Sequence, residues 1–166
     1  MCDLEVKVWT PSNPPPPEVL SELDVLGEES GVSQKLKSPI TSSSLFLSPR
    51  ALSESQTLYT LHSPTSLLGY AKTGLKNLYL YDPSSPKSSL KPYPSTLSLL
   101  DIYTPHQRLG YGKLLMDAIY SSNPTKRIAY DRPSSMLPGF LSKNYGMENG
   151  EKQNNGYMVF RDFFQE

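Results

Sequence analysis

The chain is poor in residues that bind metals or form disulfides. It has one cysteine, Cys2, and two histidines, His62 and His106, among 166 residues. A single thiol excludes an intramolecular disulfide and a cysteine-rich metal site, and it favours a reducing, intracellular compartment. Neither histidine has other potential metal ligands at a suitable spacing in the sequence. We therefore expect no metal in this protein.

Net charge of one sign and long apolar runs are also missing. Sixteen Lys and Arg balance sixteen Asp and Glu, so overall charge gives no reason to expect nucleic acid or an anionic membrane as the main partner. No apolar run approaches the roughly 20 residues of a membrane span, and the amino end lacks a signal-peptide pattern. We expect a soluble, unexported protein with one well-buried core.

Proline is abundant, with 16 residues. The prolines gather in Pro11–Pro17 and in the Pro/Ser-rich range 82–98. The first cluster predicts an irregular arm over residues 1–17, which serves as a stiff spacer or as a peptide ligand for an aromatic groove. The second predicts a long solvated loop. A single folded domain is then expected over residues 18–166.

Periodicity places helices and strands along this domain. Apolar residues at helical spacing predict a helix over Glu18–Val32, and Ser38-Pro39 predicts the start of a short second one. After Gly112, a further helix must end before Asn123-Pro124. Strands are expected over residues 56–61, 67–71, 77–81, 96–103, 127–131 and 157–164. This order predicts an α+β or mixed α/β domain built around one sheet.

The stretch HQRLGYGKLL, residues 106–115, combines two glycines with basic side chains between a strand and a helix. Glycine lets the backbone approach a ligand, and the first N–H groups of a helix are unpaired. The helix dipole adds roughly half a positive charge there, and Arg108 and Lys113 add full charges. The pattern predicts a phosphate or pyrophosphate site, although a plain glycine turn with basic neighbours is the alternative.

The spacing narrows the choice of anion. A dinucleotide fingerprint needs a third glycine where the chain has Leu115, and a Walker loop needs Ser or Thr where it has Leu114. Residues 107–112, QRLGYG, are instead similar to the Q/R-x-x-G-x-G/A loop with which GNAT acetyltransferases hold the pyrophosphate of acyl-CoA.

More motifs lie on both sides of this loop, in unbroken order along the chain. They are SPITS (38–42), GYAKTGLKNL (69–78), LDIY (100–103), AYDRPS (129–134), FLSKNYG (140–146) and VFRDFF (159–164). Over about residues 18–164 the chain closely resembles the α-tubulin N-acetyltransferase family of the GNAT superfamily. The resemblance implies a GNAT-type fold with a single central mixed β-sheet flanked by helices.

The resemblance also implies a reaction. Members of the family transfer acetyl from acetyl-CoA to a lysine ε-amine of α-tubulin in microtubules. Direct transfer in a ternary complex is expected, with acetyl-CoA as co-substrate. We expect a monomer without nucleic-acid or membrane partners, located in the cytoplasm on the microtubule cytoskeleton, including the axoneme of a cilium or flagellum.

Two catalytic positions carry over. Asp131 matches the family's aspartate, and Ser98 occupies the place of its cysteine. A lysine with a pKa of about 10.4 loses its proton at a cost of about 4 to 5 kcal/mol at neutral pH, so a positioned base is useful. Burial raises the pKa of a carboxyl group, so Asp131 should be partly buried. Arg132 should point to the opposite face of the strand.

The cofactor positions implied by the resemblance lie on two segments. Ile102 to Lys113 match the pantetheine strand end and pyrophosphate loop, and residues 134–143 match the helix beside the CoA arm. Ser134 should accept from N–H groups of that helix or bond the cofactor, and the helix should begin at Pro138, because proline inside a helix costs about 3 kcal/mol. The expected contacts are Ile102, Tyr103, Gln107, Arg108, Leu109, Gly110, Tyr111, Gly112, Lys113, Ser134, Ser135 and Lys143.

Two substitutions leave other functions open. A serine hydroxyl at Ser98 cannot act as a base near neutral pH, and Leu47 replaces a family glutamine on the tubulin-facing side. A weakened or inactive microtubule-binding homologue is therefore one alternative. A GNAT enzyme acting on another amine is the other.

Overall fold

The computed structural model describes residues 3–83, 89–106, 109–124 and 127–164. Helix α1 confirms the first predicted helix, and α4 ends just before Asn123-Pro124, as expected. In chain order the elements are β1 (Glu5–Trp9), α1 (Pro17–Ser33), α2 (Ser43–Phe46), α3 (Pro49–Ser53), β2 (Thr57–His62), β3 (Leu67–Tyr81), β4 (Leu90–Tyr103), α4 (Tyr111–Ser122), β5 (Ala129–Asp131), α5 (Leu137–Tyr145), β6 (Glu151–Lys152), β7 (Tyr157–Val159) and a 3₁₀ turn, η1 (Arg161–Phe164).

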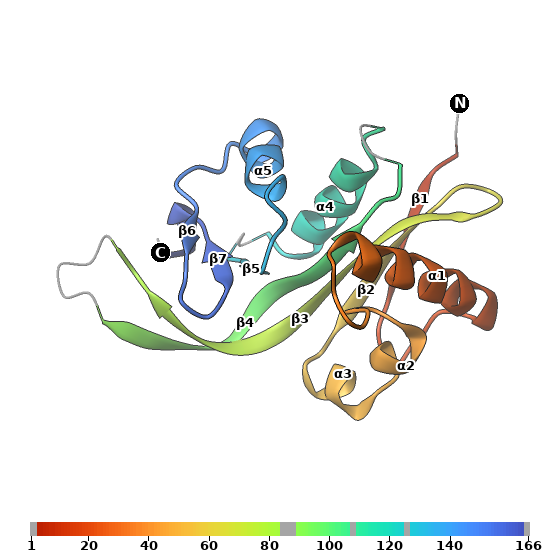
Figure 1. Ribbon diagram of the computed structural model, residues 1–166, viewed down its shortest axis with the longest axis horizontal. Coiled ribbons are helices and arrows are strands. Elements are labelled where there is room, and N and C mark those ends of the chain that lie inside the picture. Colours follow the sequence, from red (N-terminus) through yellow and green to blue (C-terminus); the bar gives the residue numbers. More distant parts are fainter. Residues whose placement is uncertain (1–2, 84–88, 107–108, 125–126, 165–166) are drawn as a thin grey trace. The chain divides into compact units, whose positions relative to one another are not determined.

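The described residues form one sheet of seven strands in the order β1-β2-β3-β4-β5-β7-β6 (Figure 1). Strands β4 and β5 run parallel, whereas β1 with β2, β2 with β3, β5 with β7 and β6 with β7 pair antiparallel. This mixed sheet with its helices confirms the predicted fold class. No helix within the described ranges is both long and apolar enough to cross a membrane.

The N-terminal arm differs from the irregular segment expected over residues 1–17. Its first part, EVKVW, is strand β1, with Val8 opposite Tyr59 of β2. The Trp9 indole Nε1 donates to Thr60 Oγ1 at 2.7 Å. The proline cluster begins only at Pro11, so the residues before it keep the N–H groups that a strand needs.

Two central strands are longer than expected. The predicted strands 67–71 and 77–81 are one strand, β3, which continues through Gly74. A Cβ at Gly74 would lie 3.0 Å from Leu100 Cδ1, so glycine allows a close approach there instead of ending the strand. Strand β4 begins at Leu90, so residues 90–95 belong to a strand and not to the predicted loop.

The helix expected at Ser38-Pro39 is replaced by two short helices further on. Ser42 Oγ accepts the N–H of Leu45 and caps α2, and Ser48 Oγ accepts the N–H of Ala51 and caps α3. Pro49 takes the first helical position of α3. A Ser-Pro pair does start a short helix, as predicted, but the pair is Ser48-Pro49 and not Ser38-Pro39.

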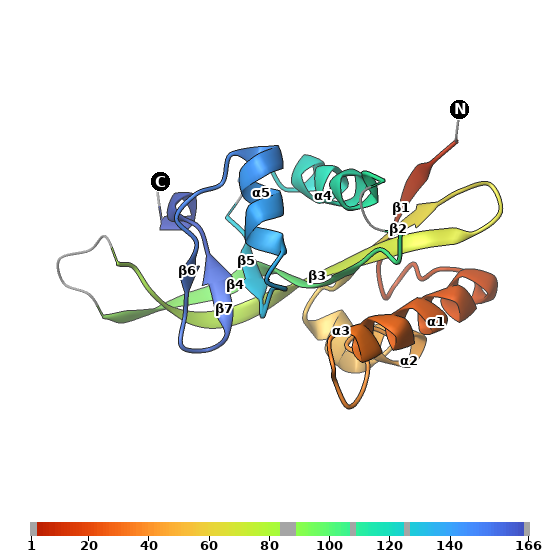
Figure 2. The same ribbon diagram turned by 45° about the horizontal axis from the view of Figure 1, so that its top comes forward.

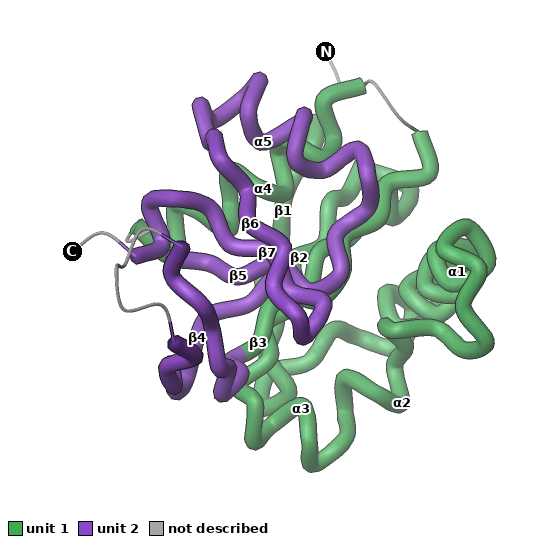
Figure 3. The backbone as a smooth tube through the Cα atoms, turned by 60° about the vertical axis from the view of Figure 1, so that its left-hand side comes forward, with its two compact units in different colours: residues 1–74, 100–124 green, residues 75–99, 125–166 purple. Residues whose placement is uncertain are grey.

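The chain divides into two compact units (Figure 3). Unit 1 comprises residues 1–74 and 100–124, and unit 2 comprises residues 75–99 and 125–166. In unit 1, α1, α2 and α3 lie on one face of the strands and α4 on the other (Figures 1 and 2). The core on the α1 side consists of Leu23, Leu26, Phe46, Leu58, Leu67 and Tyr70.

Unit 2 has its own apolar core. The predicted strand 157–164 ends after three residues as β7, and η1 follows it. Helix α5 buries Leu137 and Leu141 and carries Pro138 in its first turn, close to the expected start. The core consists of Leu78, Leu80, Ala129, Tyr157, Val159 and Phe163.

Candidate functional site

In unit 2, strand β5 and the part of β4 before residue 100 bring the two predicted catalytic positions onto one face of the sheet. Ser98 is paired with Ala129 in the parallel ladder, and Asp131 lies two residues beyond Ala129. Side chains two apart on a strand share a face, and aligned partners on neighbouring strands do as well. Ser98 is fully buried, and 18% of the Asp131 side chain is exposed. A partly buried carboxylate was expected here.

Arg132 does not point away from Asp131, as an extended strand would require. Its φ is 42°, so the backbone turns into the left-handed region directly after β5. The Arg132 Nε donates to Asp131 Oδ1 at 3.3 Å, and the arginine side chain is 81% exposed. Such an exposed ion pair contributes little energy. The Asp131 carboxylate thus has a neighbouring cation on its solvent side.

The Ser98 hydroxyl already has an acceptor. Its Oγ donates to the main-chain oxygen of Thr96 at 3.1 Å. A hydroxyl has one proton and two acceptor lone pairs, so Ser98 oriented this way acts as an acceptor toward a further group. It can orient an amine or a water, and it does not supply a base.

In unit 1, the glycine loop leads into α4 through a left-handed residue. Gly110 has φ 80° and precedes Tyr111, the first residue of the helix. Among the residues that the structure describes, none would have an atom within 4 Å of a Cβ built on Gly110. Lys113 Nζ lies 3.0 Å from Asp117 Oδ2 on the exposed side of α4. Gln107 and Arg108 lie outside the described residues, and Leu109 is exposed.

The two strand residues assigned to the cofactor face in opposite directions. The Tyr103 ring packs against Tyr70, with centroids 6.3 Å apart, and its hydroxyl donates to Glu29 of α1 at 3.4 Å. Ile102 alternates with Tyr103 along β4 and so faces the side away from α1. Only Ile102 has the orientation that a ligand opposite α1 requires.

In unit 2, Ser134, Ser135 and Lys143 are all exposed. Met136 is the residue at the N-cap of α5, which has no side-chain cap, so Ser134 does not cap this helix with its hydroxyl. The Ser134 carbonyl oxygen accepts the N–H of Leu137 at 3.1 Å instead. The other role expected for Ser134, a contact of its hydroxyl with the cofactor, stays a prediction.

Leu47 lies at the C-cap of α2 with 48% of its surface exposed. Ile40, Leu45 and Leu52 are exposed apolar residues of the same loop and of α2 and α3. The position that carries a glutamine in the resembled family is therefore an exposed apolar side chain here.

Sequence reasoning missed a buried polar cluster in unit 1. Asp101, only 6% exposed, accepts Thr41 Oγ1 at 2.8 Å and the Tyr70 hydroxyl at 2.6 Å, both on Oδ2. Burial, and then the charge of Asp101, raises the pKa of Tyr70 well above its usual value. Lys72 Nζ donates to the carbonyl oxygen of Ile40 at 2.6 Å. A carboxylate inside the apolar strand TLSLLDIY was the available signal, since buried charges require partners.

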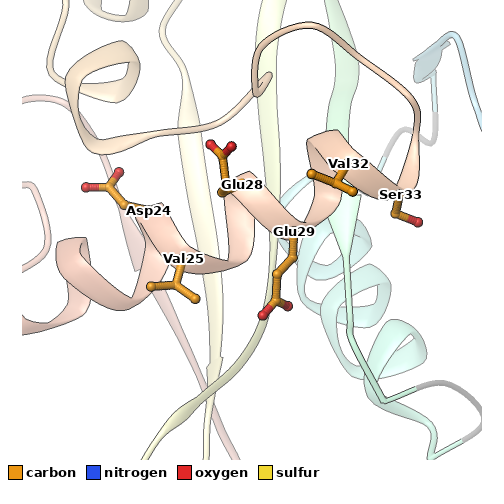
Figure 4. A pocket seen from close by; sticks show the side chains of 6 residues that line it. All are labelled: Asp24, Val25, Glu28, Glu29, Val32 and Ser33. Atoms are coloured by element: carbon orange, nitrogen blue, oxygen red, sulfur yellow. The ribbon is translucent and has the colours of Figure 1, made fainter.

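A groove of about 700 Å³ follows the outer face of α1 (Figure 4). It contains none of the site residues expected from the sequence, and it combines two valines with three acids. Its lining is Asp24, Val25, Glu28, Glu29, Val32 and Ser33. Within the parts of the chain that the structure describes, no three or more His, Cys, Asp or Glu side chains group to hold a metal ion.

Comparison with solved structures identifies the fold as that of GNAT acetyltransferases. The aminoglycoside N-acetyltransferase AAC(6')-Iy in complex with CoA superposes with a TM-score of 0.55 at 12% identity, covering 91% of both chains. The AtaT toxin bound to acetyl-CoA and to the C-terminus of the antitoxin AtaR gives 0.54 at 18% identity, covering 95% of this chain and 92% of that one.

The family is defined more narrowly by sequence. The profile of the family described as GNAT acetyltransferase, Mec-17 matches residues 7–166, and the chain belongs to this family. Alpha-tubulin N-acetyltransferase of Tetrahymena thermophila is 34% identical over 147 residues, which is 86% of this chain and 35% of the relative. Alpha-tubulin N-acetyltransferase 1 of Danio rerio is 34% identical over 161 residues, 91% of this chain and 51% of the relative.

Relatives differ in total length. The chain spans only about a third to a half of the two relatives above. The alpha-tubulin N-acetyltransferase of Phytophthora infestans is 30% identical over 166 residues, and the match covers 90% of each chain. The region shared with the longer relatives thus has nearly the length of the whole Phytophthora relative.

Proposed function

We propose that this chain transfers the acetyl group of acetyl-CoA to a lysine ε-amine of α-tubulin in microtubules, directly within a ternary complex. The observation that carries the proposal is the placement of Asp131 and Ser98 on one face of the adjacent parallel strands β4 and β5. The family and the names of the relatives support the same reaction.

The chain's residues fit acetyl-CoA at the start of α4. The first N–H groups of this 12-residue helix have no intrahelical acceptor, and the helix dipole favours an anion there. Gly110, at the N-cap, has no side chain to hinder a pyrophosphate, and Lys113 adds positive charge for it. Ile102, Leu109, Tyr111 and Gly112 complete this group, together with Gln107 and Arg108. The exposed Ser134, Ser135 and Lys143 of unit 2 are the remaining proposed contacts.

When bound, acetyl-CoA would supply an acetyl thioester, whose carbonyl carbon can bond to an amine and whose leaving group is the coenzyme A thiolate. The chain's own task is to deprotonate the lysine, which costs about 4 to 5 kcal/mol at neutral pH. Asp131 Oδ2 accepts that proton, while Oδ1 remains hydrogen-bonded to Arg132. The Ser98 oxygen accepts a hydrogen bond from the amine or from a bridging water and so orients it.

The proposed partner is α-tubulin in assembled microtubules, and the proposed location is the cytoplasmic microtubule cytoskeleton, including axonemes. A single copy of the chain is sufficient for this scheme, because every residue it uses comes from one chain. Neither nucleic acid nor membrane takes part.

Two observations favour an alternative, a microtubule-binding homologue with weak or no catalysis. The Ser98 hydroxyl donates its only proton to Thr96, and Leu47 replaces a polar side chain with an exposed apolar one. Serine lacks the thiol that an enzyme with cysteine there can ionise.

An assay with purified protein, acetyl-CoA and microtubules separates these functions. The proposal predicts acetylated α-tubulin that accumulates with time and enzyme concentration. Tight microtubule binding without acetylation above background would establish the binding homologue instead. Acetylation of another lysine protein or small amine, with tubulin unmodified, would identify a different substrate.

A further inference from the structure

Unit 2 contains a small hollow of about 40 Å³, and four of the eight residues that line it are aromatic. It lies among β5, the segment that follows α5, and the C-terminal segment that includes η1. The side chains that matter are the rings of Tyr130, Tyr145, Phe160 and Phe163 and the carboxylates of Glu148 and Asp162. None of these residues belongs to the site proposed above.

The two inner rings form walls at a right angle. The centroids of Tyr130 and Phe160 are 5.5 Å apart, and their planes meet at 89°. Both rings are buried, and the Tyr130 hydroxyl donates to Met147 Sδ at 3.7 Å. Buried rings with fixed neighbours are preorganised, and each face of an aromatic ring carries negative potential that attracts cations.

The rim adds full negative charge. Glu148 and Asp162 are exposed residues that line the same hollow. Carboxylates beside aromatic faces favour a cation over a neutral group of equal size. The Phe163 ring already makes a cation–π contact, since the Arg127 guanidinium carbon lies 5.7 Å from its centroid. The Arg127 Nε also donates to the Phe163 carbonyl oxygen at 2.9 Å.

The size of the hollow restricts the cation. One water-sized group needs roughly 10 to 15 Å³ of such volume, so about 40 Å³ accommodates a nitrogen with two or three methyl groups in part contact with solvent. A compact ammonium group is strongly hydrated and gains less from rings. Alkylation spreads the charge and supplies apolar surface, which suits aromatic walls.

We propose that this hollow binds an N-methylated ammonium group. The ring of Tyr130 and the carboxylate of Asp131 alternate along β5 and therefore face opposite sides of the strand. The hollow is thus separate from the proposed proton acceptor, and ligand binding to it is independent of acetyl transfer. Two sources supply this chemistry, a free choline-type molecule and a methylated lysine of a protein.

Titration of the full chain with choline, followed by NMR, tests the proposal. The matched probe is 3,3-dimethylbutan-1-ol, which has the shape of choline without its charge. We expect a choline dissociation constant on the order of 1 mM and at least about tenfold weaker binding of the neutral alcohol. Equal binding of the two probes, or no binding of choline at about 50 mM, would overturn the proposal.

A double variant, Glu148→Gln with Asp162→Asn, removes the rim charges without touching the buried rings. Choline binding should weaken at least about tenfold while the melting temperature stays unchanged, and the exposed Glu151→Gln should leave the affinity within about twofold. Unchanged affinity in the double variant would show that the charges of Glu148 and Asp162 do not contribute to binding.

Peptides with unmodified and trimethylated lysine distinguish the two sources of the ligand. Preference for the trimethylated peptide over choline indicates a protein partner, and the reverse indicates a free ligand.

Discussion

The Tyr70 hydroxyl donates to Oδ2 of the buried Asp101 at 2.6 Å, which links strands β3 and β4 inside unit 1. The same oxygen accepts a hydrogen bond from Thr41 Oγ1. Lys72 Nζ donates to the carbonyl oxygen of Ile40, the residue before Thr41. These bonds fix the segment that leads from α1 into α2 against the sheet. A buried carboxylate thus organises the loop between α1 and α2.

Replacing Asp101 with Asn should destabilise the protein by about 1 to 3 kcal/mol, because an amide adds a buried donor and loses the charge that strengthens both bonds. Urea unfolding measures this difference. Thr41→Val should cost less, since it removes one of the two donors. The exposed Glu28→Gln serves as control and should stay within about 0.5 kcal/mol. Equal stabilities of Asp101→Asn and the control would show that the cluster has no energetic role.

The raised pKa of Tyr70 predicts a loss of stability in alkali. The native state keeps the phenol protonated, whereas the unfolded chain ionises it near pH 10. The stabilising contribution is therefore complete below pH 10 and declines as pH rises from there toward the folded pKa. In Tyr70→Phe, the slope of unfolding free energy above pH 10 should be shallower by up to about 1.4 kcal/mol per pH unit. Parallel slopes for the two proteins would contradict this assignment.

Gly27 of α1 has no room for a side chain. A Cβ there would collide with the carbonyl oxygen of Thr41, and one at Gly31 would come within 3.3 Å of Pro39 Cα. Gly27→Ala should therefore cost about 1 to 3 kcal/mol despite alanine's better helix propensity. Gly139→Ala in α5 is the matched control, because its Cβ meets nothing within 4 Å, and it should be neutral or stabilising by up to about 1 kcal/mol. Thermal unfolding of both variants measures this difference. Similar melting temperatures would show that a Cβ at Gly27 causes no steric clash.

Ser98 should contribute little to turnover if Asp131 alone accepts the proton. Ser98→Ala removes the bond to Thr96 and is expected to keep kcat within about threefold, since an orienting bond contributes less than a base. Acetylation of microtubules at saturating acetyl-CoA provides the rate. A drop of about 100-fold or more would assign Ser98 a direct part in proton transfer.

The sequence was sufficient for the fold class because strong helical periodicity and the ordered motifs do not depend on distant contacts. It placed Asp131 and Ser98 on strands that prove adjacent. It failed where tertiary packing overrides local preference. Gly74 continues a strand because Leu100 packs closely beside it, and β1 forms in a proline-rich arm because β2 offers a partner edge.

Local conformation limited the site prediction in the same way. The turn of Arg132 into the left-handed region brings its guanidinium onto Asp131, and no strand pattern could reveal that. The cluster around Asp101 depends on Thr41, sixty residues earlier in the chain. Pairings of this kind are set by the folded chain and not by residue spacing.

Asp131→Asn tests the central claim most directly. With acetyl-CoA and microtubules, we expect kcat to fall at least about 100-fold at pH 7, with unchanged melting temperature and CoA affinity. The remaining rate should rise about tenfold per pH unit up to the lysine pKa, because solvent then supplies the free amine. A turnover rate within about threefold of the unmodified protein across this pH range would contradict the assignment of Asp131 as the proton acceptor.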